Sequence, residues 1–287
     1  MTLKFSNPKN SNEDFLFTNN QFINSKNSNE KYKVLEYSEN FEGWSDNLTK
    51  LSDDKIGDNH PIDVASREFC IYLIKKYSKT SENIILEIGC SSGNLINQIK
   101  KKIKNYIYIG SDVLKKPIYK LSKKYEDIPF IRFDITRNPL GNNFCNTIIM
   151  LNVLEHIKDD LKAIEEAHNL LIHDGLLIIE VPACRYIYDN YDKQLNHFRR
   201  YNMKDIVNKL KKNGFKIEKK THLGFLIFPI FLITKIINKI FKPKNIFVKQ
   251  SNFSNNFIVK ILFKFESILR YLYLPFGIRC VICARKI

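Results

Sequence analysis

Hydrophobic positions follow two alternating spacings between residues 61 and 222. Residues 61–78 place apolar side chains at helical spacing directly after a proline, which predicts a helix. Continuous apolar runs then alternate with amphipathic stretches of about 10–15 residues, as is typical of strands joined by helices in a parallel sheet. The runs that we expect to be strands are 83–89, 106–112, 129–134, 146–153, 176–182, 215–223 and 277–286. The fold class is therefore α/β, with a doubly wound and mostly parallel sheet.

The chain departs from this pattern at two places. Residues 1–60 are rich in Asn, Ser, Lys and Glu and carry the only tryptophan, Trp44. We therefore expect a polar, loosely ordered N-terminal extension ahead of a domain over 61–287. Residues 223–274 lengthen the connection between the last two strands far beyond a turn. This insertion carries eight basic residues and one acid, Glu266.

The insertion is predicted to form basic amphipathic helices. Its apolar run 223–234 is shorter than the roughly 20 residues that cross a bilayer. Further along, Thr234 and Lys235 share a polar face, and Ile236 and Ile240 lie on the opposite side. Helices of this type bind anionic membrane surfaces through their apolar side and their lysines. We expect reversible attachment to a membrane; a lid packed on the sheet and a subunit interface are the alternatives, and the oligomeric state stays open.

The formal net charge of +16 allows anionic partners without selecting one. Of the 46 basic residues only nine are arginine, and lysine lacks the fork that binds phosphates and bases at two points. The six cysteines are scattered, and Cys280 and Cys283 lie on a predicted strand, where positions three apart point to opposite faces. We therefore expect reduced thiols and no metal site. Residues 1–17 have no continuous apolar core, so we expect no secretory signal and a cytoplasmic location.

The stretch ILEIGCSSGNL, residues 85–95, predicts a buried strand, a tight turn and the start of a helix. Gly89 permits the turn, and Gly93 lets the helix pack closely with its first amides open to a ligand. The stretch departs from the G-x-G-x-x-G pattern of dinucleotide sites, and tight packing alone is the alternative interpretation. Asp112 and Asp134 end the next two strands, where carboxylates can bind ribose hydroxyls and an adenine amine. This combination favours a nucleoside-like ligand.

The fourth strand runs into LNVLEHIKD, residues 151–159. Together with the glycine turn, this segment resembles the seven-stranded, class I S-adenosylmethionine-dependent methyltransferases. The resemblance implies a Rossmann-like sheet of seven strands with an antiparallel last strand, and S-adenosylmethionine as the cofactor. It also implies roles for individual residues around the methyl donor. Glu87 is the acid of the motif, Gly89, Cys90 and Gly93 surround the methionine moiety, Asp112 holds the ribose, Asp134 and Ile135 frame the adenine, and Asn152, Leu154 and His156 line the opposite side.

A narrower resemblance lies in the segment 181–202, after the fifth strand. Its DKQLNHFRRY is similar to a methyltransferase subgroup with an H-x-R-R-Y pattern, whose members are often linked to cell-surface glycans or lipid-linked sugars. A hydroxyl or amine acceptor must lose a proton, and histidine suits that task. His197 is the first candidate for the base and His156 the second, and Arg199 could hold an anionic substrate group. Alternatively, His197 caps a turn and His156 only binds the donor; the other histidines, such as His60, are expected to be surface or packing residues.

These features predict an S-adenosylmethionine-dependent methyltransferase that is peripheral at the inner face of the membrane. Its acceptor is expected to be a hydroxyl of a small molecule, a glycan or a lipid-linked intermediate. An RNA methyltransferase is the first alternative, although the scarcity of arginine and the lack of a recognisable RNA-binding module speak against nucleic acid. A non-catalytic scaffold that keeps the fold is the second, and the acids Asp112, Asp134 and Glu87 speak against it.

Overall fold

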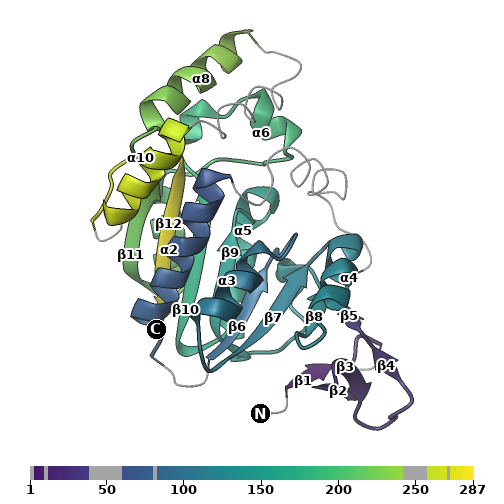
Figure 1. Ribbon diagram of the computed structural model, residues 1–287. Helices are drawn as coiled ribbons and strands as arrows, with labels where there is room; N and C mark the ends of the chain where they lie inside the picture. Colours follow the sequence, from purple (N-terminus) through teal and green to yellow (C-terminus); the bar gives the residue numbers. More distant parts are fainter. Residues whose placement is uncertain (1–2, 10–11, 39–59, 80–82, 242–256, 270–271) are drawn as a thin grey trace.

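The computed structural model describes residues 3–9, 12–38, 60–79, 83–241, 257–269 and 272–287 (Figure 1). Among these residues, eight strands form one central sheet. They are β5 (Val34–Glu36), β6 (Asn83–Ile88), β7 (Tyr106–Asp112), β8 (Phe130–Arg132), β9 (Cys145–Leu151), β10 (Leu171–Pro182), β11 (Phe215–Leu223) and β12 (Arg279–Lys286).

The strands follow one another across the sheet in the order β11-β12-β10-β9-β6-β7-β8-β5. All neighbours from β10 to β5 pair in parallel, whereas β12 is antiparallel to both β10 and β11. The doubly wound, mostly parallel sheet with an antiparallel last strand is thereby confirmed. The order of connection reverses between β6 and β9, because β6 leads outward to β7 while β9 leads to β10. In open sheets, ligands bind at the carboxyl ends of the strands beside such a reversal.

Helices cover both faces of the sheet. One face is covered by α2 (Pro61–Tyr77), α3 (Asn94–Lys102) and α4 (Lys115–Lys124), and the other by α5 (Asp160–Leu170) and α7 (Met203–Lys212). Short helical turns follow β8, β9 and β10, namely η1 (Ile135–Arg137), η2 (Leu154–His156), η3 (Arg185–Ile187) and α6 (Asn190–Gln194). On β12, Cys280 packs in the core of the α5 face and Cys283 in the core of the α2 face. The two buried thiols therefore point to opposite faces, as their spacing predicted.

Residues 3–9 and 12–38 of the N-terminal segment are folded, which corrects the expectation of a loosely ordered extension for this part of residues 1–60. The stretch 39–59 lies outside the described residues. β1 (Lys4–Ser6), β2 (Asp14–Thr18), β3 (Gln21–Asn24) and β4 (Lys31–Tyr32) form a small antiparallel sheet, drawn in purple beside β5 (Figure 1). Phe5, Phe15 and Phe22 are fully buried in the core of the α5 face. β5 then pairs with β8 as an eighth strand. Trp44 lies outside the described residues.

A two-residue turn explains why this hairpin forms. β2 and β3 each contain a short apolar run, 15–17 and 22–23, and between the strands Asn19 and Asn20 adopt φ angles of 50° and 61°. Two consecutive left-handed residues make the tight turn that matches the twist of paired strands, and asparagine tolerates that conformation. The hairpin is therefore encoded by two short apolar runs and the Asn-Asn turn between them, within a segment that is polar overall.

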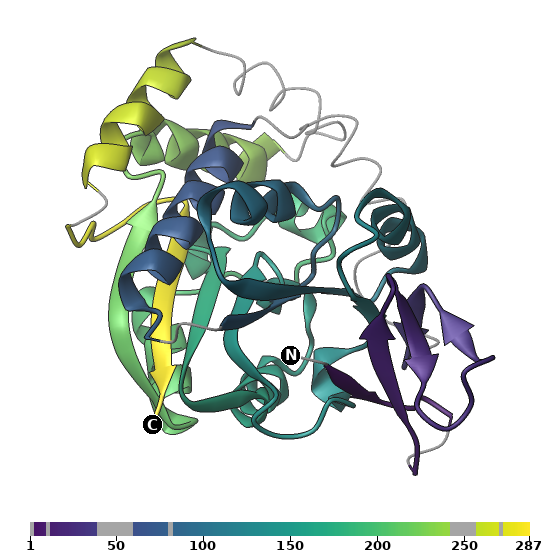
Figure 2. The same cartoon turned by 60° about the horizontal axis from the view of Figure 1, so that its bottom comes forward.

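The insertion forms two helices at the end of the molecule away from the small N-terminal sheet (Figure 2). They are α8 (Phe228–Phe241) and α10 (Phe257–Ile268). Glu266 accepts hydrogen bonds from the amides of Gly224 at 2.6 Å and Leu226 at 3.2 Å, so α10 is tied to the start of the insertion. Lys235, expected on the outer polar face, is instead 2% exposed and points inward, whereas Ile240 is exposed. Within the described residues, no helix has the length and apolar character needed to cross a membrane.

Leu35 provides a test of the folded N-terminal segment. It is buried in the core of the α5 face, so Leu35→Ala should lower the free energy of unfolding by about 2–5 kcal/mol. Urea denaturation followed by circular dichroism measures this change. Lys33→Ala, two residues earlier and exposed, is the control and should leave the midpoint almost unchanged. Equal midpoints for both variants would contradict the packing of β5.

Candidate active site

The glycine turn joins β6 to α3 at the reversal of strand order. Gly89 and Gly93 both have a φ of 76°, a left-handed conformation in which other residues are strained. A Cβ on Gly89 would lie 2.7 Å from Val153 Cγ2, and one on Gly93 would lie 2.6 Å from Leu121 Cδ2. Both positions therefore require glycine for the backbone conformation and for packing. Tight packing is thus part of the role of this turn, whatever it binds.

The amides of the turn are largely used inside the protein. The N–H groups of Gly89 and Cys90 both donate to the carbonyl of Ser111 at 2.9 Å. The N–H of Ser91 donates to Asp112 Oδ2, also at 2.9 Å. These bonds tie the turn to β7 and fix the carboxylate of Asp112 at the strand end. The turn itself therefore presents mainly a backbone surface, and the expectation that the first amides of α3 are open to a ligand stays a prediction.

A cavity of about 440 Å³ opens at the carboxyl ends of β6, β7, β8 and β9. Its volume lies within the usual range for small-ligand sites. Most of the residues that the sequence assigned to a site lie on its wall. They are Glu87, Gly89, Cys90, Asp112, Asp134, Ile135, Asn152, His156 and His197.

Acids on this wall differ in their surroundings. Glu87 is 6% exposed, and burial, followed by the charge of Asp112, raises the pKa of its carboxyl to about 8. Glu87 also accepts a hydrogen bond from the hydroxyl of Tyr108 and holds its proton near neutral pH. Asp134 begins η1 by accepting from the N–H of Thr136 at 2.9 Å. Asp112 and Asp134 therefore both fix the backbone at strand ends, in addition to any contact that they make with a ligand.

Three predicted site residues do not line the cavity. Gly93 packs against α4, and Leu154 is fully buried in the core. Arg199 donates to the carbonyl of Lys158 at 2.6 Å and pairs with Asp160 at 3.1 Å. The structure thus corrects the expectation that Arg199 holds a substrate group, since its guanidinium is engaged away from the cavity. The neighbouring Arg200 lines the cavity instead.

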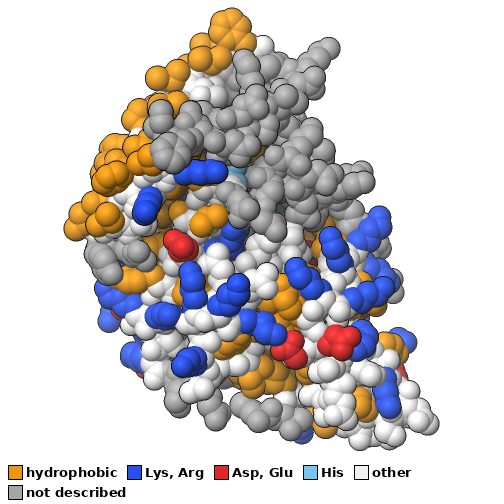
Figure 3. Space-filling view, viewed as in Figure 1, with side chains coloured by type: hydrophobic (Ala, Val, Ile, Leu, Met, Phe, Trp, Pro, Cys, Tyr) orange, Lys and Arg blue, Asp and Glu red, His pale blue; other side chains and the backbone are white. Residues whose placement is uncertain are grey.

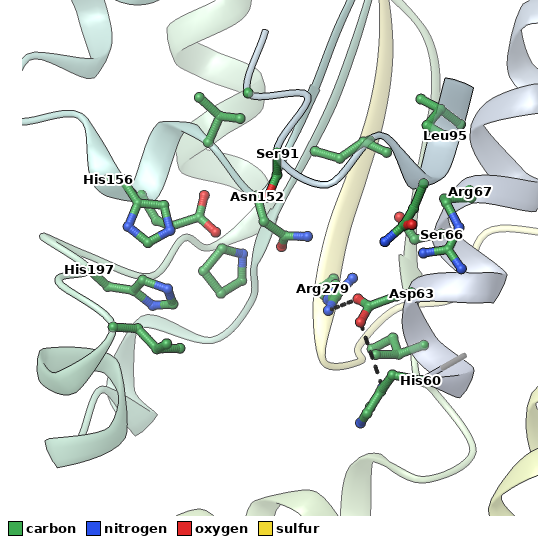
Figure 4. Close-up of a pocket in the computed structure, with 18 of the residues that line it drawn as sticks. His60, Asp63, Ser66, Arg67, Ser91, Leu95, Asn152, His156, His197 and Arg279 are labelled. Atoms are coloured by element: carbon green, nitrogen blue, oxygen red, sulfur yellow. Dashed lines mark hydrogen bonds and ion pairs between the residues drawn. The ribbon is translucent and has the colours of Figure 1, made fainter. Parts of the chain in front are cut away.

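The opposite side of the cavity carries residues that the sequence pattern did not single out (Figure 4). Asp63 on α2 accepts a hydrogen bond from Arg279 on β12 at 2.6 Å, and Arg279 also donates to Glu180 at 2.7 Å. His60 lies 4.0 Å from Asp63 and also lines the cavity. Asp63 and Arg279 are 216 residues apart, so no local spacing could have linked them.

His197 and Asp192 form a hydrogen-bonded pair on the wall that faces these residues. Nδ1 of His197 lies 3.0 Å from Oδ1 of Asp192, which is fully buried. Burial alone would raise the pKa of Asp192, but the contacts with His197, Arg200 and Lys235 hold it far below its usual range. Asp192 is therefore a carboxylate. It follows that Nδ1 of His197 carries the proton and that Nε2 is left as an acceptor.

His156 packs edge-on against His197, with ring centroids 4.7 Å apart. Burial, and then the proximity of His197, lower the pKa of His156 to about 3. The pKa of His197 is also lowered, mainly by burial, while Asp192 counteracts this effect. A histidine with a pKa of about 3 is a weak base, so His197 is the stronger candidate for proton abstraction.

Glu155 completes a cluster with the two histidines. One donor atom from each of Glu155, His156 and His197 lies within 4.8 Å of the others, a spacing that could hold a divalent cation. Burial raises the pKa of the Glu155 carboxyl to about 8, so this group is mainly neutral at neutral pH. Metal ligands must be deprotonated. A cation bound here would therefore have to displace the proton of Glu155.

Comparison with known proteins defines the class. The chain matches the family described as a methyltransferase domain over residues 39–220, and it belongs to that family. It is 28% identical to an uncharacterised protein of Methanocaldococcus jannaschii over an alignment of 191 residues, with coverage of 61% of this chain and 80% of that protein. It is 22% identical to a "Probable S-adenosylmethionine-dependent methyltransferase" of Mycolicibacterium smegmatis over an alignment of 139 residues, with coverage of 47% of this chain and 52% of that protein. The chain therefore spans about half the length of the latter relative.

Solved structures share the fold. The [4+2]-cyclase SpnF has a TM-score of 0.56 at 13% identity, with coverage of 86% of this chain and 97% of SpnF. The N-methyltransferase NodS from Bradyrhizobium japonicum, in complex with S-adenosylhomocysteine, has a TM-score of 0.50 at 12% identity, with coverage of 84% and 99%. At such identities the likeness concerns the fold alone, and the family match carries the class.

The protein is an S-adenosylmethionine-dependent methyltransferase with a class I, Rossmann-like fold. Its cavity fits the cofactor, because Gly89 presents no side chain beside Cys90 and Asn152, and two acids end strands further along the same wall. The cofactor, when bound, supplies a methyl group on a sulfonium sulfur. The roles of single residues toward it stay predictions.

Titration calorimetry with S-adenosylhomocysteine tests the glycine turn. Gly89→Trp should abolish binding, because the side chain has no space beside Val153 and the cavity. Gly141→Trp is a matched control, since Gly141 has the same φ of 76° but a Cβ there would meet no atom of the described residues within 4 Å. We expect Gly141→Trp to bind like the wild type, with circular dichroism confirming that both variants fold. Equal binding by both variants would contradict the assignment of this turn to the cofactor.

Proposed function

We propose that this methyltransferase acts on a hydroxyl of a small-molecule, glycan or lipid-linked acceptor at a membrane surface, as a member of the subgroup with an H-x-R-R-Y acceptor loop. The observation that carries the proposal is the buried Asp192–His197 pair, whose histidine lines the same cavity as the glycine turn. A hydroxyl must lose its proton during methylation, and a histidine oriented by a carboxylate is suited to take it.

Methyl transfer to a hydroxyl gives His197 and Asp192 different tasks. The reaction forms a bond between the acceptor oxygen and the methyl carbon and breaks the bond from that carbon to sulfur, which keeps the electron pair. The hydroxyl proton passes to Nε2 of His197. Asp192 keeps Nδ1 protonated and stabilises the imidazolium that results. Alignment of the two reactants supplies much of the remaining rate enhancement.

Mutation of His197 tests the base. His197→Ala should lower kcat by about 10²–10⁴-fold and leave the affinity for S-adenosylhomocysteine nearly unchanged. Transfer of a tritiated methyl group into solvent-extractable lipid from a membrane fraction measures turnover. Nuclease treatment of the aqueous phase of the same reaction reports the RNA alternative. Full turnover of His197→Ala would exclude this base, and nuclease-sensitive counts would favour the RNA methyltransferase.

The pH profile gives an independent check on His197. Only the neutral imidazole can accept the proton, and burial lowers the pKa of His197 below its ordinary value of 6.5. The rate should therefore fall at acidic pH with a midpoint below pH 6.5. A midpoint at or above pH 6.5 would contradict the lowered pKa.

Membrane association is supported by the outer surface of the insertion. Large apolar side chains gather there along the edge formed by α8 and α10 (Figure 3). Those that are between 47% and 66% exposed include Ile233, Ile236, Ile237, Ile240, Phe265 and Ile268. Lys260 and Lys264 are exposed on α10 as well. Apolar and basic groups on one surface complement an anionic bilayer, and such a cluster of exposed apolar residues marks an interaction site.

The inner sides of the same helices line the cavity. Ile227 and Phe231 approach it from the α8 side, and Val259 and Phe263 approach it from α10. An amphiphilic acceptor would find apolar walls here while its hydroxyl reaches His197. The lid and the membrane-binding surface are thus two sides of one insertion, which supports a lipid-linked acceptor.

Flotation with liposomes that contain anionic phospholipid tests the outer surface. Ile236→Glu should weaken binding at least about tenfold, because it removes apolar area and adds a repelled charge. Leu161→Glu is the matched control, since Leu161 on α5 and Ile236 are both 48% exposed. This control should float like the wild type. A wild-type protein that stays in the soluble fraction at low salt would contradict membrane attachment.

A further inference from the structure

The segment 181–202, which follows β10, contacts the insertion through one buried lysine. Lys235, on the inner side of α8, is 2% exposed. Its Nζ donates to Asp189 Oδ1 at 2.7 Å and to Asp192 Oδ2 at 2.9 Å. Asp189 begins α6, and Asp192 lies three residues further on, so a residue of the insertion is bonded to the carboxylate that orients His197.

The two oxygens of Asp192 have different partners. Oδ1 accepts from Arg200 at 2.8 Å and from Nδ1 of His197. Oδ2 accepts from Lys235 and from the N–H of Asp189 at 3.1 Å. Both edges of the carboxylate are therefore held, and its plane is fixed toward the imidazole. Removal of Lys235 would leave Oδ2 with the single backbone donor.

These charges balance inside the protein. Asp189 and Asp192 supply two negative charges, and Arg200 and Lys235 supply two positive ones, all on side chains that are at most 5% exposed. A buried charge that loses its partner is strongly unfavourable, so the four groups depend on one another. The cluster holds together a loop after β10 and a helix of the insertion.

We propose that Lys235 is a positioning residue for the catalytic histidine, so that the insertion contributes to the reaction as well as covering the cavity. The proposal rests on the role of His197 in the proposed function. The ammonium group of Lys235 is bonded to Asp189 and Asp192, and it is not assigned a contact with the reacting atoms. It acts through Asp192, whose orientation and charge it sets.

Lys235 also acts on the charge of His197. The groups that face the His197 ring are Asp192 from α6, Arg200, Lys235 from α8, and His156 and Glu155 from η2. The hydroxyl of Tyr188 contacts the His197 backbone carbonyl at 2.7 Å. Among these groups, Lys235 and Arg200 disfavour the imidazolium and Asp192 favours it. Loss of the Lys235 charge should therefore raise the pKa of His197.

Nuclear magnetic resonance of the full chain, labelled in its histidine rings, measures this effect without an acceptor. The signal of His197 is assigned with His197→Gln. In Lys235→Met, the pKa of His197 should rise by about 1 unit or more. Lys235→Arg keeps the charge and should stay near the wild type. Lys239→Met, one turn further along α8 and exposed, is the matched control and should not shift the pKa.

A second variant covers the case in which Lys235→Met does not fold. Asp189→Asn/Lys235→Met removes one charge of each sign, so the net charge of the cluster stays at zero. Its ¹⁵N shifts should show that His197 no longer keeps a single Nδ1-protonated tautomer. A wild-type pKa in folded Lys235→Met, or a wild-type tautomer in the double variant, would overturn the proposal.

Binding of S-adenosylhomocysteine, measured in the same samples, separates this proposal from the proposed function. Wild-type affinity together with a shifted His197 signal supports a positioning role for Lys235. Wild-type affinity with an unshifted signal rejects that role and leaves methyl transfer intact. Full turnover by His197→Ala would reject the base itself, and the positioning role with it.

Discussion

The reversal of strand order between β6 and β9 is the constraint on which the site depends. The chain leaves β6 into α3 on one face of the sheet and leaves β9 toward α5 on the other, so the two connections diverge. The space between them cannot be filled by either loop, and it becomes the cavity. Gly89 and Gly93 allow the first connection to turn away sharply, and its amides are tied to β7 rather than left to move. A ligand therefore meets a prearranged wall.

Electrostatics organises the acceptor side in a different way. Carboxyl groups such as Glu87 and Glu155 stay neutral because burial disfavours their charge, whereas Asp192 stays charged because cations surround it. The two histidines differ in a similar way. His156 is too weakly basic to accept a proton near neutral pH, whereas His197 is hydrogen-bonded to a carboxylate. Neutral and charged groups of the same type thus lie close together with different chemical tasks.

The sequence predicted the parts of this structure that depend on local patterns. Apolar periodicity placed the strands and most helices, and the glycine turn with Asp112 and Asp134 marked the strand ends that line the cavity. It failed where the determining contact is distant. The sequence around Lys235 does not indicate its hydrogen bond to Asp192. The helical pattern shows only a polar residue beside apolar isoleucines. The N-terminal hairpin is hard to predict for another reason, since its short apolar runs and the turn at Asn19 and Asn20 lie in a segment that is polar overall.

β5 has a consequence for how the molecule behaves at high concentration. Without it, β8 would end the sheet and leave its backbone groups open to another chain. β5 pairs with β8 and is itself only three residues long, so it offers few free groups for strand addition. Because apolar side chains are exposed on α8 and α10, a short strand at the opposite edge of the sheet limits a second route to self-association. The short β5 thereby disfavours strand pairing between molecules, while the apolar surface of α8 and α10 stays exposed.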